Sequence, residues 1–178
     1  MRPQERKRLL ALEIRSSKFG YAVFDGPIEL LDWGVRWFGE KTSSPMAAAS
    51  DRTRFLLNLH APGTVVTRER NYFSLGVNRR FAMIMRAIRI ETRRHHAAFK
   101  VLTTHQVQRC FALHGCATKH EIATHLAKQF EVLSWRLPER RKPHNSEPRA
   151  TVIFDAAATG VAFLEKSARQ SEKHRSVS

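Results

Sequence analysis

Three apolar runs at the start of the chain predict β-strands. Residues 9–14 and 19–24 are almost continuously apolar and are separated by the polar turn RSSK, and the run LLDWGVRWF at 30–38 follows the Gly-Pro turn of DGPIE. Strands with such short connections pair as antiparallel neighbours. The opening of the chain therefore predicts a three-stranded antiparallel meander.

After the meander, helical and strand-like patterns alternate. A helix capped by Ser50 or Asp51 is expected to end at the Ala-Pro-Gly sequence at 61–63, and the β-branched run at 64–70 predicts a fourth strand. A second helix is expected over 75–99 and a fifth strand over 99–104. The apolar residues that recur at helical spacing in the second helix are Phe81, Ile84, Met85, Ile88 and Phe99. This order predicts an α/β fold whose mixed sheet, the meander plus parallel strands, carries helices on both faces.

Helical patterns dominate the last third of the chain. A short helix over 105–115 is expected to end at Gly115, and the T-x-x-E pattern of Thr118 and Glu121 is a capping box that opens a helix to Phe130. The proline-rich stretch 136–149 predicts a basic loop, and the small apolar residues of 150–166 predict a final helix. We expect one domain over residues 1–165 and a disordered basic tail over 166–178.

Charge narrows the classes of partner. Lys and Arg number 31 against 16 Asp and Glu, which gives a net charge of +15 and an isoelectric point near 11.0. Such an excess favours a polyanionic partner, most often nucleic acid. The alternatives are an anionic membrane surface or a basic surface without a specific ligand.

The sequence gives no sign of a membrane-spanning segment. No run approaches the ~18 uncharged apolar residues that a membrane helix needs, and the basic start MRPQERKR leads into a run interrupted by Glu13 and Arg15, unlike a secretory signal. The two cysteines, Cys110 and Cys116, are too few for a disulfide framework and favour a reducing compartment. We therefore expect a cytoplasmic protein.

Basic residues cluster in two places. One is the side of the 75–99 helix opposite its apolar residues, and the other surrounds the loop that precedes the last helix. Both sets are candidates for phosphate contacts, and the alternative for the loop is a merely solvated segment. The candidate nucleic-acid-binding residues are Arg79, Arg86, Arg89, Arg93, Lys119, Arg140, Arg141, Lys142 and Arg149.

Three carboxylates lie in unusually apolar settings. Glu13 lies within the first strand, Glu69 ends the fourth strand, and Asp155 lies in the apolar helix VIFDAAATG. A buried carboxylate is costly unless it has a partner or a metal, so three of them could share a divalent-metal site. Two such ions, about 3.5–4 Å apart, can support phosphodiester cleavage.

Each carboxylate also has an ordinary explanation. Glu13 could be exposed on an edge strand or pair with Arg15 or Arg68. Glu69 lies between two arginines and could be surface charge, and Asp155 could cap or solvate the last helix. Ion pairs also place acids in such settings.

Several segments resemble one known family. LLALEIRSSKFGYAVFD (9–25) is similar to the first hairpin of the RuvC-like Holliday-junction resolvases of the RNase H-like superfamily, and LLDWGVR resembles their third strand. APGTVVTRE resembles their fourth strand, which ends in a catalytic Glu, and FDAAATGVAFL resembles their last helix, which carries catalytic Asp. The strand and helix pair at 101–130 are also similar. The resemblance covers roughly residues 8–165 and implies an RNase H-like fold.

The resemblance implies a function as well as a fold. It implies a homodimeric, Mg²⁺- or Mn²⁺-dependent endonuclease that cleaves branched or structured DNA such as Holliday junctions. Glu13, Glu69 and Asp155 take the catalytic and metal-binding positions, and such a set could hold two ions. The 75–99 helix lies near the family's dimer contact, where facing arginines would repel, so its arginines indicate an exposed phosphate-binding face or a different dimer.

Two departures from the family pattern keep an alternative open. Glu13 stands where the family has Asp, which extends the carboxylate by one methylene, and Val152 stands where the family has a second Asp on the last helix. Both departures bear on the affinity for metal ions and on the rate of cleavage. The alternative function is a nucleic-acid-binding protein that has the RNase H-like fold and impaired catalysis.

A cluster of soft ligands is the remaining chemical feature. His105, Cys110, His114, Cys116 and His120 fall within one short stretch, and zinc favours such ligands. Their spacing matches no standard C-x₂-C pattern. The alternative is a helix pair with core cysteines and surface histidines.

Overall fold

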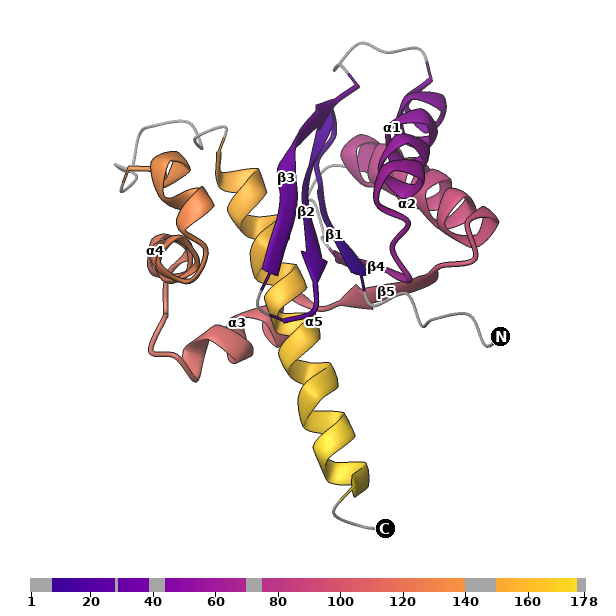
Figure 1. Cartoon of the computed structure of the whole chain (residues 1–178). Helices are drawn as coiled ribbons and strands as arrows, with labels where there is room; N and C mark the ends of the chain where they lie inside the picture. Colours follow the sequence, from indigo (N-terminus) through magenta and orange to yellow (C-terminus); the bar gives the residue numbers. More distant parts are fainter. Residues whose placement is uncertain (1–7, 28, 39–43, 70–74, 140–149, 176–178) are drawn as a thin grey trace.

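A five-stranded mixed sheet forms the centre of the molecule (Figure 1). The computed structural model describes residues 8–27, 29–38, 44–69, 75–139 and 150–175. The strands β1 (Arg8–Ile14), β2 (Lys18–Asp25) and β3 (Glu29–Trp37) form an antiparallel meander, and β4 (Thr64–Arg68) and β5 (Ala98–Leu102) extend it in parallel with β1. The resulting order is β3-β2-β1-β4-β5, which confirms the predicted α/β sheet.

Helices cover both faces of this sheet (Figure 1). On one face lie α1 (Pro45–His60) and α2 (Leu75–Arg94), and on the other lie α3 (Thr104–Ala112), α4 (Lys119–Gln129), the short 3₁₀ helix η1 (Glu131–Arg136) and α5 (Thr151–Arg175). Each face has its own apolar core. Within the described ranges, no helix is both long enough and apolar enough to cross a membrane.

The alternation of side chains along β1 divides it between the two cores. Leu10, Leu12 and Ile14 pack toward α1 and α2, whereas Leu9 and Ala11 pack toward α5. Successive side chains on a strand point to opposite faces. Glu13, two residues beyond Ala11, therefore faces α5, and it is 0% exposed.

Glycines let α5 lie unusually close to the sheet. A Cβ at Gly20 would lie 2.2 Å from the Val152 carbonyl oxygen, and a Cβ at Gly160 would lie 2.3 Å from the Phe24 ring. Gly20 is the residue of β2 paired with Glu13. The missing side chain at this position therefore allows the first turns of α5 to approach the strand that carries Glu13.

The first helix begins earlier than its sequence pattern indicates. Ser44, rather than Ser50 or Asp51, caps α1, and its hydroxyl accepts a hydrogen bond from Ala47 N at 3.3 Å. The Ser50 hydroxyl instead donates to the carboxylate of Glu91 on α2 at 2.6 Å. A tertiary hydrogen bond thus occupies the side chain that the local pattern assigned to a cap.

The ends of the other helices differ in two places. The expected 75–99 helix ends at Arg94, because His96 adopts a positive φ of 55° and Phe99 lies in β5. The expected disordered tail from 166 is wrong for the described residues, because α5 continues through Arg175. An ion pair between Arg169 and Glu165, 3.2 Å apart at helical i,i+4 spacing, supports this extension. The predicted capping box at Thr118 and Glu121 is confirmed.

Gly20→Ala is expected to destabilise the protein by ~1–3 kcal/mol, since the added methyl group must displace the backbone of α5. The measurement is the free energy of unfolding in urea. Gly34→Ala on β3 is the matched control, because its Cβ would meet only side-chain atoms of Tyr21, at 3.1 Å or more. Equal losses in the two variants would contradict a special role for the contact at Gly20.

Candidate functional site

The fold brings Glu13 on β1 and Asp155 on α5 to one place, where two arginines lie between them. Arg68 Nη2 is 3.1 Å from Glu13 Oε2 and 3.6 Å from Asp155 Oδ2. Arg15 Nη2 donates to Asp155 Oδ2 at 2.7 Å, and its Nη1 is 3.7 Å from Glu13 Oε1. We call these four residues the arginine–carboxylate centre. The pairing of Glu13 with Arg15 and Arg68, one of the alternatives raised from the sequence, is confirmed.

Strand register explains why Arg68 rather than Glu69 reaches this centre. In the parallel pairing of β1 and β4, Ala11 lies beside Val66 and Leu12 beside Thr67. Continuing that register by one residue places Arg68 beside Glu13, on the α5 side of the sheet. Glu69 follows with the opposite orientation and is exposed, and its backbone N–H bonds to the Leu102 carbonyl at 2.9 Å.

The three acids predicted to share metal ions do not form a compact group around a single point, and their role as metal ligands stays a prediction. Among the described residues, one group of three potential metal ligands has donor atoms within 4.8 Å of one another. Glu13, Glu69 and Asp155 are not members of that group. Val152, at the position of the family's second Asp, is buried in the apolar core beneath α5.

The arginine–carboxylate centre does not fit a pair of divalent cations. Besides the two guanidinium groups, Lys119 Nζ lies 3.6 Å from Asp155 Oδ2. Three cationic groups thus lie within 4 Å of the carboxylates of Glu13 and Asp155, which supply only two negative charges. An added Mg²⁺ would meet repulsion from these three groups, and it would compete with Arg15 for Asp155 Oδ2.

A cavity of about 290 Å³ opens beside this centre, and its mostly apolar lining includes a few charged groups. Arg68, Lys119 and Asp155 form part of its wall, together with Thr104 and Thr151. Thr104, Lys119 and Thr151 are the first residues of α3, α4 and α5. Helix N-termini carry partial positive charge, so three of them and two cationic side chains offer phosphate contacts, beside the carboxylates of Asp155 and Glu139 in the same wall.

The predicted nucleic-acid-binding residues fall into three groups. Lys119 lines the cavity, as described above. The arginines predicted on the second helix all lie on α2 with exposed side chains; they are Arg79, Arg86, Arg89 and Arg93. Arg140, Arg141, Lys142 and Arg149 lie outside the described residues.

The predicted cluster of soft ligands is only partly assembled. Cys110 and His114 both lie beside Glu165 of α5. In the described part of the chain, these three residues form the group of potential ligands whose donor atoms lie within 4.8 Å of one another. His105, Cys116 and His120 are not members of it. Glu165 is not recognisable from the local spacing, because it lies on a different helix far along the chain.

Comparison with known proteins reveals similarity at the level of structure. No protein-family model and no curated protein matches the sequence. The structure is similar to that of T. thermophilus RuvC in complex with Holliday junction substrate, with a TM-score of 0.67 and 15% identity over 87% of this chain and 91% of that chain. It is also similar to the yeast mitochondrial Holliday junction resolvase Ydc2, with a TM-score of 0.67 and 11% identity over 96% of this chain and 82% of that chain.

The chain has the RuvC fold. The resemblance of the sequence segments to RuvC-like resolvases is thereby confirmed as a likeness of fold, despite the low identity. A third structure, the Fowlpox virus resolvase with substrate Holliday junction DNA, matches with a TM-score of 0.50 and 11% identity over 89% of this chain and 99% of that chain.

Arg68→Met is expected to lower the free energy of unfolding by ~3–5 kcal/mol, because it leaves a buried carboxylate undercompensated. The double variant E13Q/R68M removes both charges and should recover most of that loss. Urea unfolding at neutral pH provides the measurement.

Lys119→Met is the control for this test, since the Lys119 side chain is 57% exposed and its ion pair should contribute ~1 kcal/mol at most. A loss in Arg68→Met no larger than in Lys119→Met would contradict the buried pairing.

Proposed function

We propose that this protein binds branched DNA through a RuvC fold in which arginines take the place of catalytic metal ions. The observation that carries the proposal is the pairing of Arg15 and Arg68 with Glu13 and Asp155. Two-metal cleavage needs carboxylate oxygens that are available to the ions. In this protein Asp155 Oδ2 accepts from Arg15, and both Glu13 oxygens lie within 4 Å of guanidinium groups, which favours the binding function over the cleaving one.

Permanent positive charge at the centre also favours binding. A guanidinium group stays protonated at any physiological pH, and its planar fork suits both carboxylate and phosphate oxygens. With Lys119, the centre carries one more positive than negative charge. The cavity wall itself carries two cationic groups, Arg68 and Lys119, beside the carboxylates of Asp155 and Glu139, so a DNA phosphate could contact cations there without a bound divalent ion.

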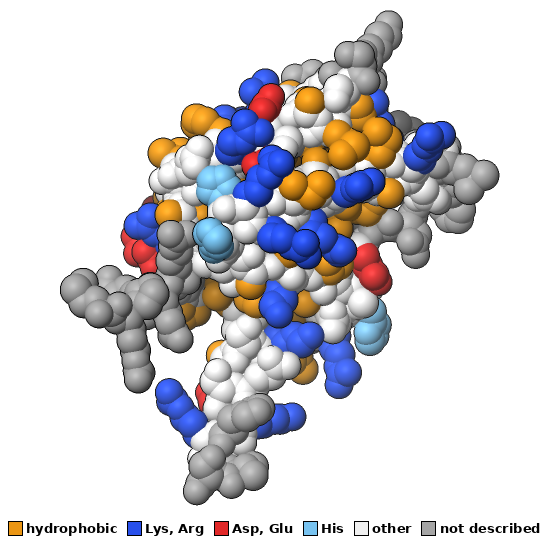
Figure 2. Space-filling view, turned by 90° about the vertical axis from the view of Figure 1, so that its right-hand side faces the viewer, with side chains coloured by type: hydrophobic (Ala, Val, Ile, Leu, Met, Phe, Trp, Pro, Cys, Tyr) orange, Lys and Arg blue, Asp and Glu red, His pale blue; other side chains and the backbone are white. Residues whose placement is uncertain are grey.

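The exposed face of α2 supports the same function. Figure 2 shows the α1 and α2 side of the molecule, where Lys and Arg side chains gather and few acidic ones appear. The only acidic residue in α2 is Glu91, which is 1% exposed and is paired with Arg54 and Arg94. The exposed arginines span residues 79–93, about 21 Å along the helix axis, which is long enough to follow several phosphates.

Branched DNA is the substrate class that the structural neighbours suggest. The T. thermophilus RuvC structure and the Fowlpox virus resolvase structure both contain a Holliday junction. The fold and the basic surface carry this suggestion to the present chain. A homodimer stays a prediction, and the repulsion between facing α2 arginines argues against a dimer contact through that helix.

A metal-dependent endonuclease for branched DNA is the second candidate. The observation in its favour is that Glu13 and Asp155 do meet, at the junction of β1 and α5, in a fold shared with resolvases. It requires metal binding at a centre where three cationic groups already lie. The two candidates differ in one measurable property, namely cleavage.

We expect the protein to bind a synthetic four-way DNA junction more tightly than a linear duplex, without cutting it in Mg²⁺ or Mn²⁺. Gel-shift titrations with and without the ions, followed by denaturing gels of the same samples, provide the measurement. Cleavage that requires the ions and is lost in Asp155→Asn, with junction binding retained, would overturn the proposal in favour of the endonuclease.

The double variant R86Q/R93Q is expected to reduce the slope of log K against log salt concentration by about 2, since each lost phosphate contact removes about 0.9. Fluorescence anisotropy with the junction over a range of KCl concentrations measures this slope. Lys128→Gln, which changes an exposed cation on α4 on the other side of the sheet, is the control and should leave the slope unchanged. An unchanged slope in the double variant would exclude α2 from the DNA interface.

A further inference from the structure

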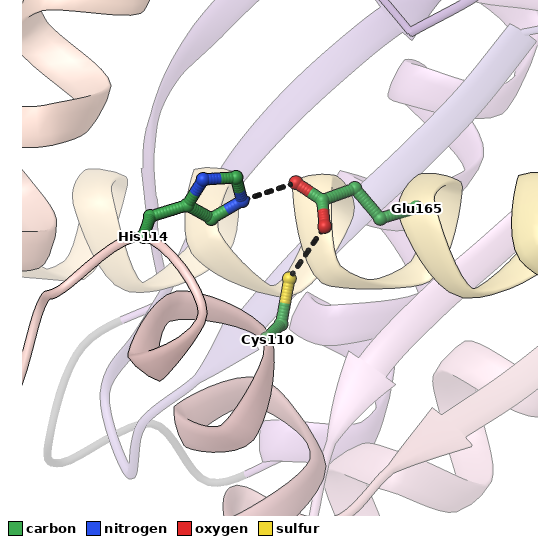
Figure 3. Close-up of side chains that lie close together, drawn as sticks. All are labelled: Cys110, His114 and Glu165. Atoms are coloured by element: carbon green, nitrogen blue, oxygen red, sulfur yellow. Dashed lines mark hydrogen bonds and ion pairs between the residues drawn. The ribbon is translucent and has the colours of Figure 1, made fainter.

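We propose that Cys110, His114 and Glu165 form a zinc-binding site. The three side chains come from α3, the turn after α3 and the middle of α5, and they point toward one another (Figure 3). Their donor atoms lie within 4.8 Å of one another. This site is separate from the arginine–carboxylate centre, and the proposal does not depend on the proposed DNA-binding function.

The distances are close to those between ligands of one small ion. His114 Nε2 lies 2.9 Å from Glu165 Oε1, and Cys110 Sγ lies 3.3 Å from Glu165 Oε2. Donor atoms that bind one tetrahedral zinc ion at about 2.0–2.3 Å lie about 3.3–3.8 Å from one another. Small side-chain rotations therefore suffice to place an ion between the three groups.

The donor set favours zinc over the other common metal ions. A thiolate, an imidazole and a carboxylate are all zinc ligands, whereas Mg²⁺ and Ca²⁺ take oxygen ligands almost exclusively. Three protein ligands leave the fourth tetrahedral position to water. His125 on α4 borders the site, with its ring centroid 5.0 Å from that of His114.

The surroundings of Cys110 allow metal binding but keep the free thiol protonated. Burial, together with the hydrogen bond to Glu165 and the charge of that carboxylate, raises the pKa of Cys110 to about 12. Without metal, the thiol therefore serves as a hydrogen-bond donor. Zinc would displace the thiol proton to solvent, so its affinity should rise with pH.

The neighbouring positive charge of Arg169 competes only weakly with a metal ion for Glu165. Arg169 Nη2 lies 3.2 Å from Glu165 Oε2, but the Arg169 side chain is 47% exposed. Exposed ion pairs contribute ~1 kcal/mol at most, so the guanidinium group can yield this oxygen to an ion. His114 is 38% exposed and Glu165 33%, which gives the ion a route from solvent.

A bound ion would connect α3 and its following turn to the middle of α5. These two parts of the chain are otherwise joined by apolar packing and by the hydrogen bonds described above. Zinc would therefore stabilise the packing of α3 against the helix that carries Asp155. The effect should appear as stabilisation of the whole protein, whether or not DNA is present.

The test uses the full chain, purified with a chelator and then titrated with Zn²⁺ against a chromophoric zinc indicator, and separately with Co²⁺. We expect one zinc ion per chain, a higher melting temperature with zinc, and a thiolate-to-cobalt charge-transfer band. Cys110→Ser should abolish the band, and His114→Ala and Glu165→Gln should each weaken zinc binding at least tenfold.

Cys116→Ser and His120→Ala are the matched controls, because both residues belong to the same sequence stretch but not to the site. Both controls should bind zinc as the wild type does. Absence of stoichiometric zinc, a cobalt complex without the thiolate band, or equal loss in the controls and the site variants would overturn the proposal. Circular dichroism verifies that each variant is folded.

Discussion

The buried charge of Glu13 is the constraint on which the site depends. This side chain is fully buried under α5, and a carboxylate in such a place requires compensation worth several kcal/mol. Arg68, 7% exposed on the neighbouring strand, provides it, and Arg15 adds a second cation from the turn after β1. Because the partner comes from β4, the pairing holds only in one register of β1 against β4. The sheet order and the chemistry of the site are therefore specified together.

The sequence predicts the elements of this fold well and the site only in part. Apolar runs and turn residues locate all five strands, because each strand is a local pattern of four or more residues. Glu13 and Asp155 are recognisable because each is a single acid in an apolar segment, and both lie at the centre. Glu69, the third predicted acid, lies exposed just beyond the end of β4, and its role stays a prediction.

The missed features all depend on contacts between distant segments. Arg68 is recognisable from the sequence only as one possible partner of Glu13, because the register that brings β4 and β1 together is not contained in either strand alone. Ser50 resembles a helix cap in the sequence, but its hydroxyl bonds to Glu91 of α2, a contact that the sequence around Ser50 does not reveal. Glu165 joins Cys110 and His114 only because α5 crosses the end of α3.

The length of α5 has a consequence for encounters with other molecules. Beyond Glu165 the helix continues for ten residues with mostly exposed side chains, a further length of about 15 Å. Lys166, Arg169, Lys173 and Arg175 lie on this projection, where Glu172 is the only acid. Charges on a protruding rod act on a polyanion before the body of the protein reaches it, and salt weakens this long-range attraction. The positive charges at the end of α5 thus attract a polyanion at a greater distance from the core than the charges on the core itself.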